Sequence, residues 1–196
     1  GGNALTFNST LDGGTNDLNL TAGAGSISFN DAVSNMGTTT VASASNVTAA
    51  STFGGDAYVQ SIGGGTTDFQ GAVTLSGNLD YNGTNLTIGA AGNTVGGDMT
   101  VTNSGVYTQN GDIVVTGAFD QDGAGTNALG GDLAATSIRF QGASSALTDN
   151  VIFTSAGAAG NDITFDSAIA GGTNDLTLNA GASGDITLSG DVTNAG

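Results

Sequence analysis

The chain has 196 residues, carries a formal net charge of −16 and contains no Cys, Pro, Trp, His, Glu or Lys. Every acidic residue is Asp, and the single basic residue is Arg139. These absences exclude disulfides, thiol and imidazole chemistry and lysine-dependent catalysis, and the charge disfavours nucleic acid and anionic lipid as partners.

Composition alone leaves disorder as an alternative, because Gly-rich chains with high net charge often cannot bury enough apolar surface to fold. Only 9% of the residues are charged, however, and the apolar residues come in short regular clusters. No apolar run approaches the roughly 20 residues of a transmembrane helix, and no signal-peptide pattern opens the chain. We therefore expect a folded segment without membrane insertion, taken from a longer protein because it begins with Gly1 instead of Met.

The two ends of the chain contain copies of one repeated sequence. Residues 1–37 align with residues 159–196 at 20 of 37 positions, with one residue inserted near Ser183. Weaker echoes of the same text begin at Gly64, Gly83 and Gly125. Self-similarity at a fixed period is typical of repeat architectures, so we expect residues 1–196 to form a single segment of a longer array whose ends share one phase.

Within each copy, an apolar, a polar and a second apolar residue follow one another. This period of two predicts short strands whose polar middle residue points outward. The tripeptides fall at residues 5–7, 18–20, 27–29, 86–88, 99–101, 163–165, 176–178 and 186–188. The side chains that we expect to point inward include Leu5, Phe7, Leu18, Ile163, Phe165 and Leu176.

Gly, Asn and Asp separate these strands. The turn candidates, in chain order, are Asp12-Gly13-Gly14, Asn82-Gly83, Asn110-Gly111 and Asp122-Gly123. We expect these residues to supply the positive φ that tight turns require. We also expect equivalent asparagines, such as Asn16 and Asn174, to stack into amide ladders that satisfy the turn backbone.

Two all-β folds fit this pattern. Asn-Gly and Asp-Gly turns suit an antiparallel sandwich, but its strands would be longer. A parallel β-helix (β-solenoid) fits better, because Ile186 restores the text of Ile163 after 23 residues and the absence of Pro leaves every backbone N–H free to pair. We predict roughly 20–26 residues per coil and eight or nine coils spanning roughly 40 Å.

The texts at residues 160–166 and 171–181 resemble the β-helical repeats of filamentous-haemagglutinin-like and autotransporter-type bacterial surface adhesins. The resemblance covers most of the chain and is compositional, with only the terminal copies matching cleanly. It implies a right-handed β-helix, secretion across the outer membrane and a role in adhesion, biofilm or surface fibres.

Calcium is the metal to consider, because Asp is the only carboxylate and Ca²⁺ prefers oxygen ligands. The nearest motif is the Gly-Gly-x-Gly-x-Asp repeat of calcium-binding β-rolls. Residues 13–17 and 171–175 depart from it, since Asn16 and Asn174 replace the fourth-position Gly and the Asp comes one residue early. Gly-Gly-Asp at 54–56, 96–98 and 130–132 is weaker still. We assign no metal ligand and no cofactor, and a calcium-binding β-roll is the alternative function.

Catalysis and ice binding are the other candidate activities. The carboxylate pairs with suitable spacing are Asp120 with Asp122 and Asp162 with Asp166. We expect no enzyme, because Asp is frequent throughout and Arg139, in an outward strand position, is the only cation. We expect Arg139 to pair with a nearby Asp. Thr100 and Thr102 form one Thr-x-Thr, whereas an ice-binding face needs paired Thr ranks in every coil.

We therefore predict an extracellular, structural or adhesive β-solenoid that forms a stalk or fibre of a bacterial surface adhesin. Its mechanism is stacking, since each coil pairs with the next, and the acidic exterior discourages lateral aggregation. The expected partners are further repeats of the same chain, other copies of itself, and host or cell-surface glycans or proteins.

Overall fold

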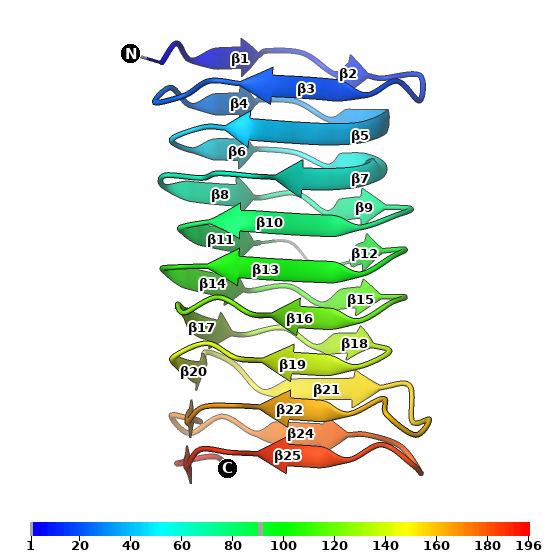
Figure 1. Cartoon of the computed structure of the whole chain (residues 1–196), viewed down its shortest axis with the longest axis vertical. Coiled ribbons are helices and arrows are strands. Elements are labelled where there is room, and N and C mark those ends of the chain that lie inside the picture. Colours follow the sequence, from blue (N-terminus) through cyan, green and yellow to red (C-terminus); the bar gives the residue numbers. More distant parts are fainter. Residues whose placement is uncertain (1, 90–91) are drawn as a thin grey trace.

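The apolar-polar-apolar tripeptides form strands, because alternation lets one side of each strand face a core. In the computed structural model, which describes residues 2–89 and 92–196, these strands stack into an all-β parallel solenoid of about nine turns (Figure 1). All eight tripeptides lie in strands, and every strand pairing within the described ranges is parallel. The solenoid prediction is confirmed, and the antiparallel sandwich and disorder are ruled out.

Each coil contributes strands to three faces. Face 1 contains β1 (Leu5–Phe7), β4 (Ile27–Phe29), β6 (Val47–Ala49), β8 (Thr66–Phe69), β11 (Asn85–Ile88), β14 (Val106–Gln109), β17 (Thr126–Leu129), β20 (Ser144–Leu147), β23 (Ile169–Ala170) and β26 (Val192–Thr193). Face 2 contains β2 (Leu11–Asp12), the first parts of β5 (Val33–Ser43) and β7 (Phe53–Gln60), β9 (Val73–Leu75), β12 (Asn93–Val95), β15 (Ile113–Val115), β18 (Leu133–Ala135), β21 (Val151–Ser155) and β24 (Leu176–Asn179).

Face 3 contains β3 (Leu18–Thr21), the later parts of β5 and β7, β10 (Leu79–Gly83), β13 (Met99–Asn103), β16 (Phe119–Gln121), β19 (Ile138–Phe140), β22 (Ile163–Phe165) and β25 (Ile186–Leu188). Faces 2 and 3 form one sheet of 16 strands, because β5 and β7 run through the corner between them. We number the complete coils 1 to 9 from the N-terminus, each beginning with its face 1 strand, and β26 begins an incomplete tenth coil.

Figure 1 shows the hand of the coil. The face 3 strands β10 and β13 lie in front and run from right to left, whereas β11 and β12 behind them run from left to right. Because the chain descends from its N-terminus at the top, the coil is right-handed. Equivalent residues are separated by 20 residues in the middle, as in Tyr107 and Asn127, and by 23 residues near the end, as in Ile163 and Ile186.

Columns of stacked side chains fill the interior. Phe140 stacks on Phe165 at 4.8 Å between ring centroids and lies 5.0 Å from Phe119. The inward positions predicted from the sequence are confirmed. Ile163 and Phe165 are fully buried, and the other four, which lie in the first and last coils, are half-buried and packed against the core: Leu5, Phe7, Leu18 and Leu176.

The two copies of the terminal text lie on different faces. Residues 5–7 form β1 on face 1, but the matching residues 163–165 form β22 on face 3. Residues 18–20 lie in β3 on face 3, and the matching residues 176–178 lie in β24 on face 2. Matching segments of the two sequence copies therefore occupy different faces of the solenoid. The tripeptide specifies which side chains point inward but does not specify a face.

The expectation that glycine supplies a positive φ is wrong at Gly83, Gly111 and Gly123. Gly14 does have a φ of +53°, but Gly83 lies inside β10, paired with Asn103. At Gly123 an added Cβ would collide with the backbone of Asn103 in the preceding coil. Glycine is required there because adjacent coils approach closely, not because the backbone is left-handed.

Candidate functional site

The outward side of face 3 holds a group of charged and hydroxyl side chains that we call the face 3 platform: Asp80, Thr100, Thr102, Asp120, Asp122, Arg139, Thr164 and Asp166. The parallel register places Asp80, Thr100, Asp120, Arg139 and Thr164 in one column. A second column runs beside it, in which the hydroxyl of Thr102 donates to the carboxylate of Asp122.

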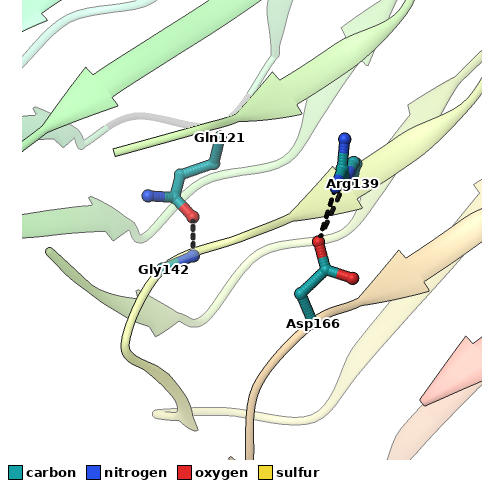
Figure 2. A network of polar contacts seen from close by, with 4 residues as sticks. All are labelled: Gln121, Arg139, Gly142 and Asp166. Carbon is teal, nitrogen blue, oxygen red and sulfur yellow. Dashed lines mark hydrogen bonds and ion pairs between the residues drawn. The ribbon is translucent and has the colours of Figure 1, made fainter. Parts of the chain in front are cut away.

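Arg139 forms an ion pair with Asp166 across adjacent coils (Figure 2). Its Nε and Nη2 donate to Asp166 Oδ2 at 3.0 and 2.9 Å. Gln141 turns its side-chain amide toward the same guanidinium, and its oxygen accepts from Arg139 Nη1 at 2.7 Å in the orientation that satisfies both groups. The expected pairing of Arg139 with a nearby Asp is confirmed. Because the Arg139 side chain is 51% exposed and that of Asp166 is 32% exposed, solvent screens the pair and it contributes at most about 1 kcal/mol.

Two carboxyl groups on the platform have raised pKa values. Loss of hydration is the main cause at Asp120, and repulsion from Asp122 and Asp166 adds to it, whereas Arg139 lowers the pKa. Loss of hydration, followed by repulsion from Asp98, likewise raises the pKa of Asp80. One carboxylate oxygen of Asp120 is shielded from solvent and has no hydrogen-bond partner in the described structure. The platform therefore holds its negative charge at some energetic cost.

The structure treats the two candidate catalytic pairs differently. Asp120 and Asp122 both lie on the platform, but Asp122 is already bonded to Thr102. Asp162 and Asp166 lie at opposite ends of β22, and each has its own partner. Asp162 accepts the backbone N–H of Asp185 at 2.9 Å, whereas Asp166 binds Arg139. The second pair therefore does not form one site.

Two open grooves follow corners of the coil. One groove, of about 390 Å³, adjoins the platform where face 3 turns toward face 1, and its lining includes Ser61, Asn82, Gly83, Thr102, Asp122 and Gly123. The other, of about 740 Å³, lies between faces 2 and 3 near the N-terminal end, and its lining includes Thr15, Asp17, Asn35, Gly37, Gly55 and Asp56. Both are open grooves, and their linings combine hydroxyl, amide and carboxylate groups with apolar side chains such as Ile62 in the first and Met36 in the second.

Four of the five aspartates in the candidate calcium segments, Asp17, Asp56, Asp98 and Asp132, accept hydrogen bonds from the protein's own chain. Asp17 Oδ1 accepts the backbone N–H of Thr38, and Asp98 Oδ1 accepts that of Ala118, each at 2.8 Å. Asp56 Oδ1 accepts the hydroxyl of Ser76 at 2.8 Å. Within residues 2–89 and 92–196 no cluster of three or more Asp side chains is placed to hold a metal ion.

These bonds belong to a general device that the sequence interpretation missed. Asp or Asn side chains at the corners accept a backbone N–H from the next coil, 20 or 21 residues later in most cases. The acceptors include Asp17, Asn46, Asn78, Asn85, Asp98, Asp112 and Asp132. In several cases a glycine precedes the donor, and its missing Cβ makes room for the acceptor oxygen, as Gly117 does for Asp98. An Asp or Asn with a Gly 19 or 20 residues later is the sequence signal that identifies these side chains.

The expected amide ladder at Asn16 and Asn174 takes a different form. Each side chain donates to a backbone carbonyl, Asn16 to Gly13 at 2.8 Å and Asn174 to Leu147 at 3.1 Å. A side-chain ladder step does occur elsewhere, where Asn30 donates to Asn8 Oδ1 at 2.8 Å. The turn backbone is thus satisfied as expected, but Asn16 and Asn174 lie in separate coils and do not stack on each other.

The Thr-x-Thr at residues 100 and 102 has no matching rank in the adjacent coils. Asp80 and Asn82 occupy the equivalent positions in the preceding coil, and Asp120 and Asp122 occupy them in the following coil. Charged neighbours interrupt the flat rank of Thr that ice binding requires. Face 3 therefore lacks the geometry of an ice-binding surface.

A polar network inside the solenoid was also missed. Gln121 Oε1 accepts the backbone N–H of Gly142 at 2.8 Å (Figure 2), and its Nε2 donates to Asn103 Oδ1 at 2.7 Å. The other buried polar side chains of the interior include Gln60, Thr67, Gln109, Asn127 and Ser145. The signal was present as aromatic-x-Gln at residues 58–60, 107–109 and 119–121, where alternation places the Gln inward.

Comparison of the chain with protein families, with curated proteins and with solved structures found no match. None of the described segments is a helix long and apolar enough to cross a membrane. The adhesin resemblance therefore remains a hypothesis, and the solenoid fold is supported by the structure.

Proposed function

We propose that the chain is an extracellular structural segment of a bacterial surface adhesin, acting as a rigid stalk or fibre. The observation that carries the proposal is the continuous pairing of all nine coils, with ten strands in an unbroken parallel sheet on face 1. At about 4.8 Å per coil, the stack extends roughly 40 Å. Each coil is fixed by its neighbours, so bending requires loss of ladder hydrogen bonds and of core packing.

The surface chemistry supports the same role. Asp, Thr, Ser and Asn occupy the outward positions, and the net charge of −16 keeps the rods apart in solution. On the adhesive side, the partners are host or cell-surface glycans or proteins, and the groove beside the face 3 platform offers hydroxyl, amide and carboxylate groups to them.

The proposal is tested on intact cells that produce the protein. Antibodies against the folded chain should label these cells without permeabilisation, and external protease should remove the label. Labelling that requires permeabilisation contradicts an extracellular location.

A calcium-binding β-roll is the alternative function. The observation that favours it is that Asp17 and Asp56 line the same groove. A structural Ca²⁺ predicts that a chelator lowers the melting temperature by several degrees. An unchanged melt eliminates this alternative and leaves the structural proposal in place.

A further inference from the structure

The groove of about 390 Å³ beside the face 3 platform, which we call the corner groove, follows the axis of the solenoid. It is lined by one segment from each of four successive coils: 61–63, 82–84, 102–104 and 122–124. Figure 1 shows the ends of β10 and β13, which contribute to it, one above the other. A ligand in this groove therefore meets the same kind of position once in every coil.

Glycine forms most of the floor of the corner groove. A Cβ on Gly63 would collide with the side-chain amide of Gln60, and a Cβ on Gly83 would collide with the hydroxyl of Tyr81. These positions therefore face inward and leave bare backbone on the outside. The residues before and after each floor position point outward, so two rows of side chains flank the floor.

A β-bulge at the end of the groove nearer the N-terminus turns Ile62 into solvent. Gln60 pairs with Tyr81, and the floor glycines Gly63 and Gly83 stack on each other. Three residues lead from Gln60 to Gly63, but only two lead from Tyr81 to Gly83, so the earlier coil holds one extra residue. Ile62 is 64% exposed, the most of any large apolar side chain in the described chain. Bulges of this kind are found beside binding sites, where they redirect one side chain.

Several polar groups of the corner groove have no partner within the protein. Among the described residues, the exposed side chains of Ser61, Asn82 and Ser104 form no hydrogen bond. At the other end of the groove, Asp122 Oδ1 accepts the hydroxyl of Thr102, which leaves Oδ2 available. The groove thus presents free hydroxyl, amide and carboxylate groups along its length, with an apolar group at one end.

The spacing of these groups selects the shape of the ligand. Successive coils are about 4.8 Å apart, whereas an extended peptide repeats its side chains on one side every two residues, at about 6.6–6.8 Å. A peptide therefore falls out of step with the groove within a few coils. The rings of a straight β-1,4-linked polysaccharide follow one another at nearly the coil spacing, so each coil meets one ring. Their hydroxyl groups suit the free polar groups, and their apolar C–H faces suit Ile62.

The charge of the groove selects the kind of sugar. The chain has a net charge of −16, and Asp120 and Asp122 lie close enough for their repulsion to contribute to the raised pKa of Asp120. Sugars with carboxylate or sulfate groups are therefore repelled. An ammonium group relieves the repulsion instead, and the platform already accepts one cation of its own, because Arg139 binds Asp166.

We propose that the corner groove binds a linear β-1,4-linked polysaccharide of amino sugars, with one ring in each of the four coils. The ring at one end packs on Ile62, the middle rings bind Asn82 and the neighbouring hydroxyl groups, and an ammonium group at the other end pairs with Asp122. This inference rests on the proposed adhesive function and names the class of glycan that the segment holds.

The test compares four probes by NMR titration of the purified 196-residue chain. The β-1,4-linked glucosamine tetramer should bind most tightly, and neutral cellotetraose should bind more weakly at the same residues. Maltotetraose has the same composition as cellotetraose but a curved α-1,4-linked chain, and a lysine tetrapeptide has the charge without the sugar. Both should bind much more weakly than the glucosamine tetramer, and the shifts caused by that tetramer should be confined to the four lining segments.

Three results overturn the proposal. Equal binding of cellotetraose and maltotetraose shows that coil spacing does not select the ligand. Binding of the lysine tetrapeptide as tight as that of the glucosamine tetramer shows that charge alone is recognised. Absence of shifts in the lining segments with the glucosamine tetramer shows that the corner groove is not the site.

Substitutions at exposed positions test the two ends of the groove. Ile62→Ser should weaken binding of the glucosamine tetramer, whereas Ile152→Ser, at an exposed position on face 2, should not. Asp122→Asn should weaken it by about fivefold, because one screened ion pair is lost. Asp68→Asn makes the same charge change on face 1 and should leave binding intact. Equal losses in Asp122→Asn and Asp68→Asn contradict the site. Melting of each variant establishes that it is folded.

The two proposals fail in different experiments. Binding is measured on the purified chain, so a chain that labels the cell surface but binds none of these sugars overturns the glycan site and leaves the extracellular stalk. A chain that binds the glucosamine tetramer but is found only inside permeabilised cells overturns the proposed location and leaves the site.

Discussion

The interiors of the middle coils and of the terminal coils are built from different side chains. In the middle, Gln60, Gln109 and Gln121 occupy inward positions and bond across coils, together with buried Asn, Thr and Tyr side chains. At the ends the inward positions hold Leu, Ile, Phe and Val, and the same text lies on face 1 at one end and on face 3 at the other. Apolar columns therefore tolerate several registers.

This difference between middle and terminal coils shows which coils specify the stacking register of the solenoid. A shift of one coil or one face exchanges one apolar side chain for another at the ends, at small cost. In the middle the same shift leaves the amides of Gln121 and Asn103 without partners, which costs about 1–3 kcal/mol for each buried group. We infer that the polar network fixes which coil stacks on which, and that the terminal coils follow it.

The largest predicted loss of stability comes from replacing a core phenylalanine with alanine, and we compare this change in a middle coil and in the first coil. Phe140→Ala should cost about 3–5 kcal/mol, because Phe140 is fully buried and contacts three rings. Phe7→Ala should cost about 1–2 kcal/mol, because Phe7 is half-buried and stacks on Phe29 alone among the described rings. Urea unfolding measures both values. Equal costs contradict a difference between middle and end.

Next is Gln121→Leu, which keeps the side-chain volume but removes the amide. It should destabilise by about 2–4 kcal/mol, because Asn103 Oδ1 and the N–H of Gly142 lose their partners inside the solenoid. The matched control is Gln70→Leu, at an exposed position whose amide donates to Asp68, with an expected change within about 0.5 kcal/mol. If the two variants melt alike, the polar network contributes nothing.

A smaller effect is expected at the corners. Asp98→Ala should cost about 1 kcal/mol, because the N–H of Ala118 loses its acceptor. Asp98→Asn should be close to neutral, since Asn78 makes the same bond with the N–H of Asp98 one coil earlier. Asp68→Ala is the control, because the carboxylate of Asp68 accepts a side-chain amide, that of Gln70, and no backbone N–H among the described residues. A loss of stability in Asp98→Asn as large as in Asp98→Ala assigns the effect to charge instead.

The smallest effect is the pH dependence of the middle coils. The pKa values of Asp80 and Asp120 are raised above the ordinary 3.8, so between that value and the raised pKa the folded state holds more protons than the unfolded state. Their contribution to stability therefore falls as the pH rises through this window and increases on acidification from neutral pH. Thermal melts of wild type and of a variant combining Asp80→Asn with Asp120→Asn should show a smaller gain in the variant. If the wild type and the variant show the same pH dependence of melting, Asp80 and Asp120 do not contribute to it.

Much of the fold can be predicted from the sequence, because short local patterns determine which side chains point inward. An alternation such as that of residues 163–165 fixes which side chains point inward, and the return of the text at Ile186 gives the length of the coil. The face of each strand did not follow, because an apolar tripeptide suits any face. The buried glutamines were not predicted, although Gln121 lies two residues after Phe119 and therefore shares its inward phase.

The site was less predictable than the fold. The pairing of Arg139 with an Asp followed from the presence of one cation among many carboxylates, but the identity of Asp166 depends on register between coils 27 residues apart in sequence. The bonds from corner Asp and Asn side chains to the next coil likewise join residues that are distant in the chain. Such contacts appear in a sequence only after the coil length is known.

Hydrogen exchange resolved coil by coil, in wild type and in Gln121→Leu, tests the central claim most directly. Our account predicts that backbone amides of coils 4–7 exchange most slowly in wild type, that protection decreases toward both ends, and that Gln121→Leu lowers protection in coils 5–8 more than in coils 1 and 2. Terminal coils as protected as the middle, or a variant whose middle coils keep their protection, would contradict the claim that the buried polar network holds the stack in register.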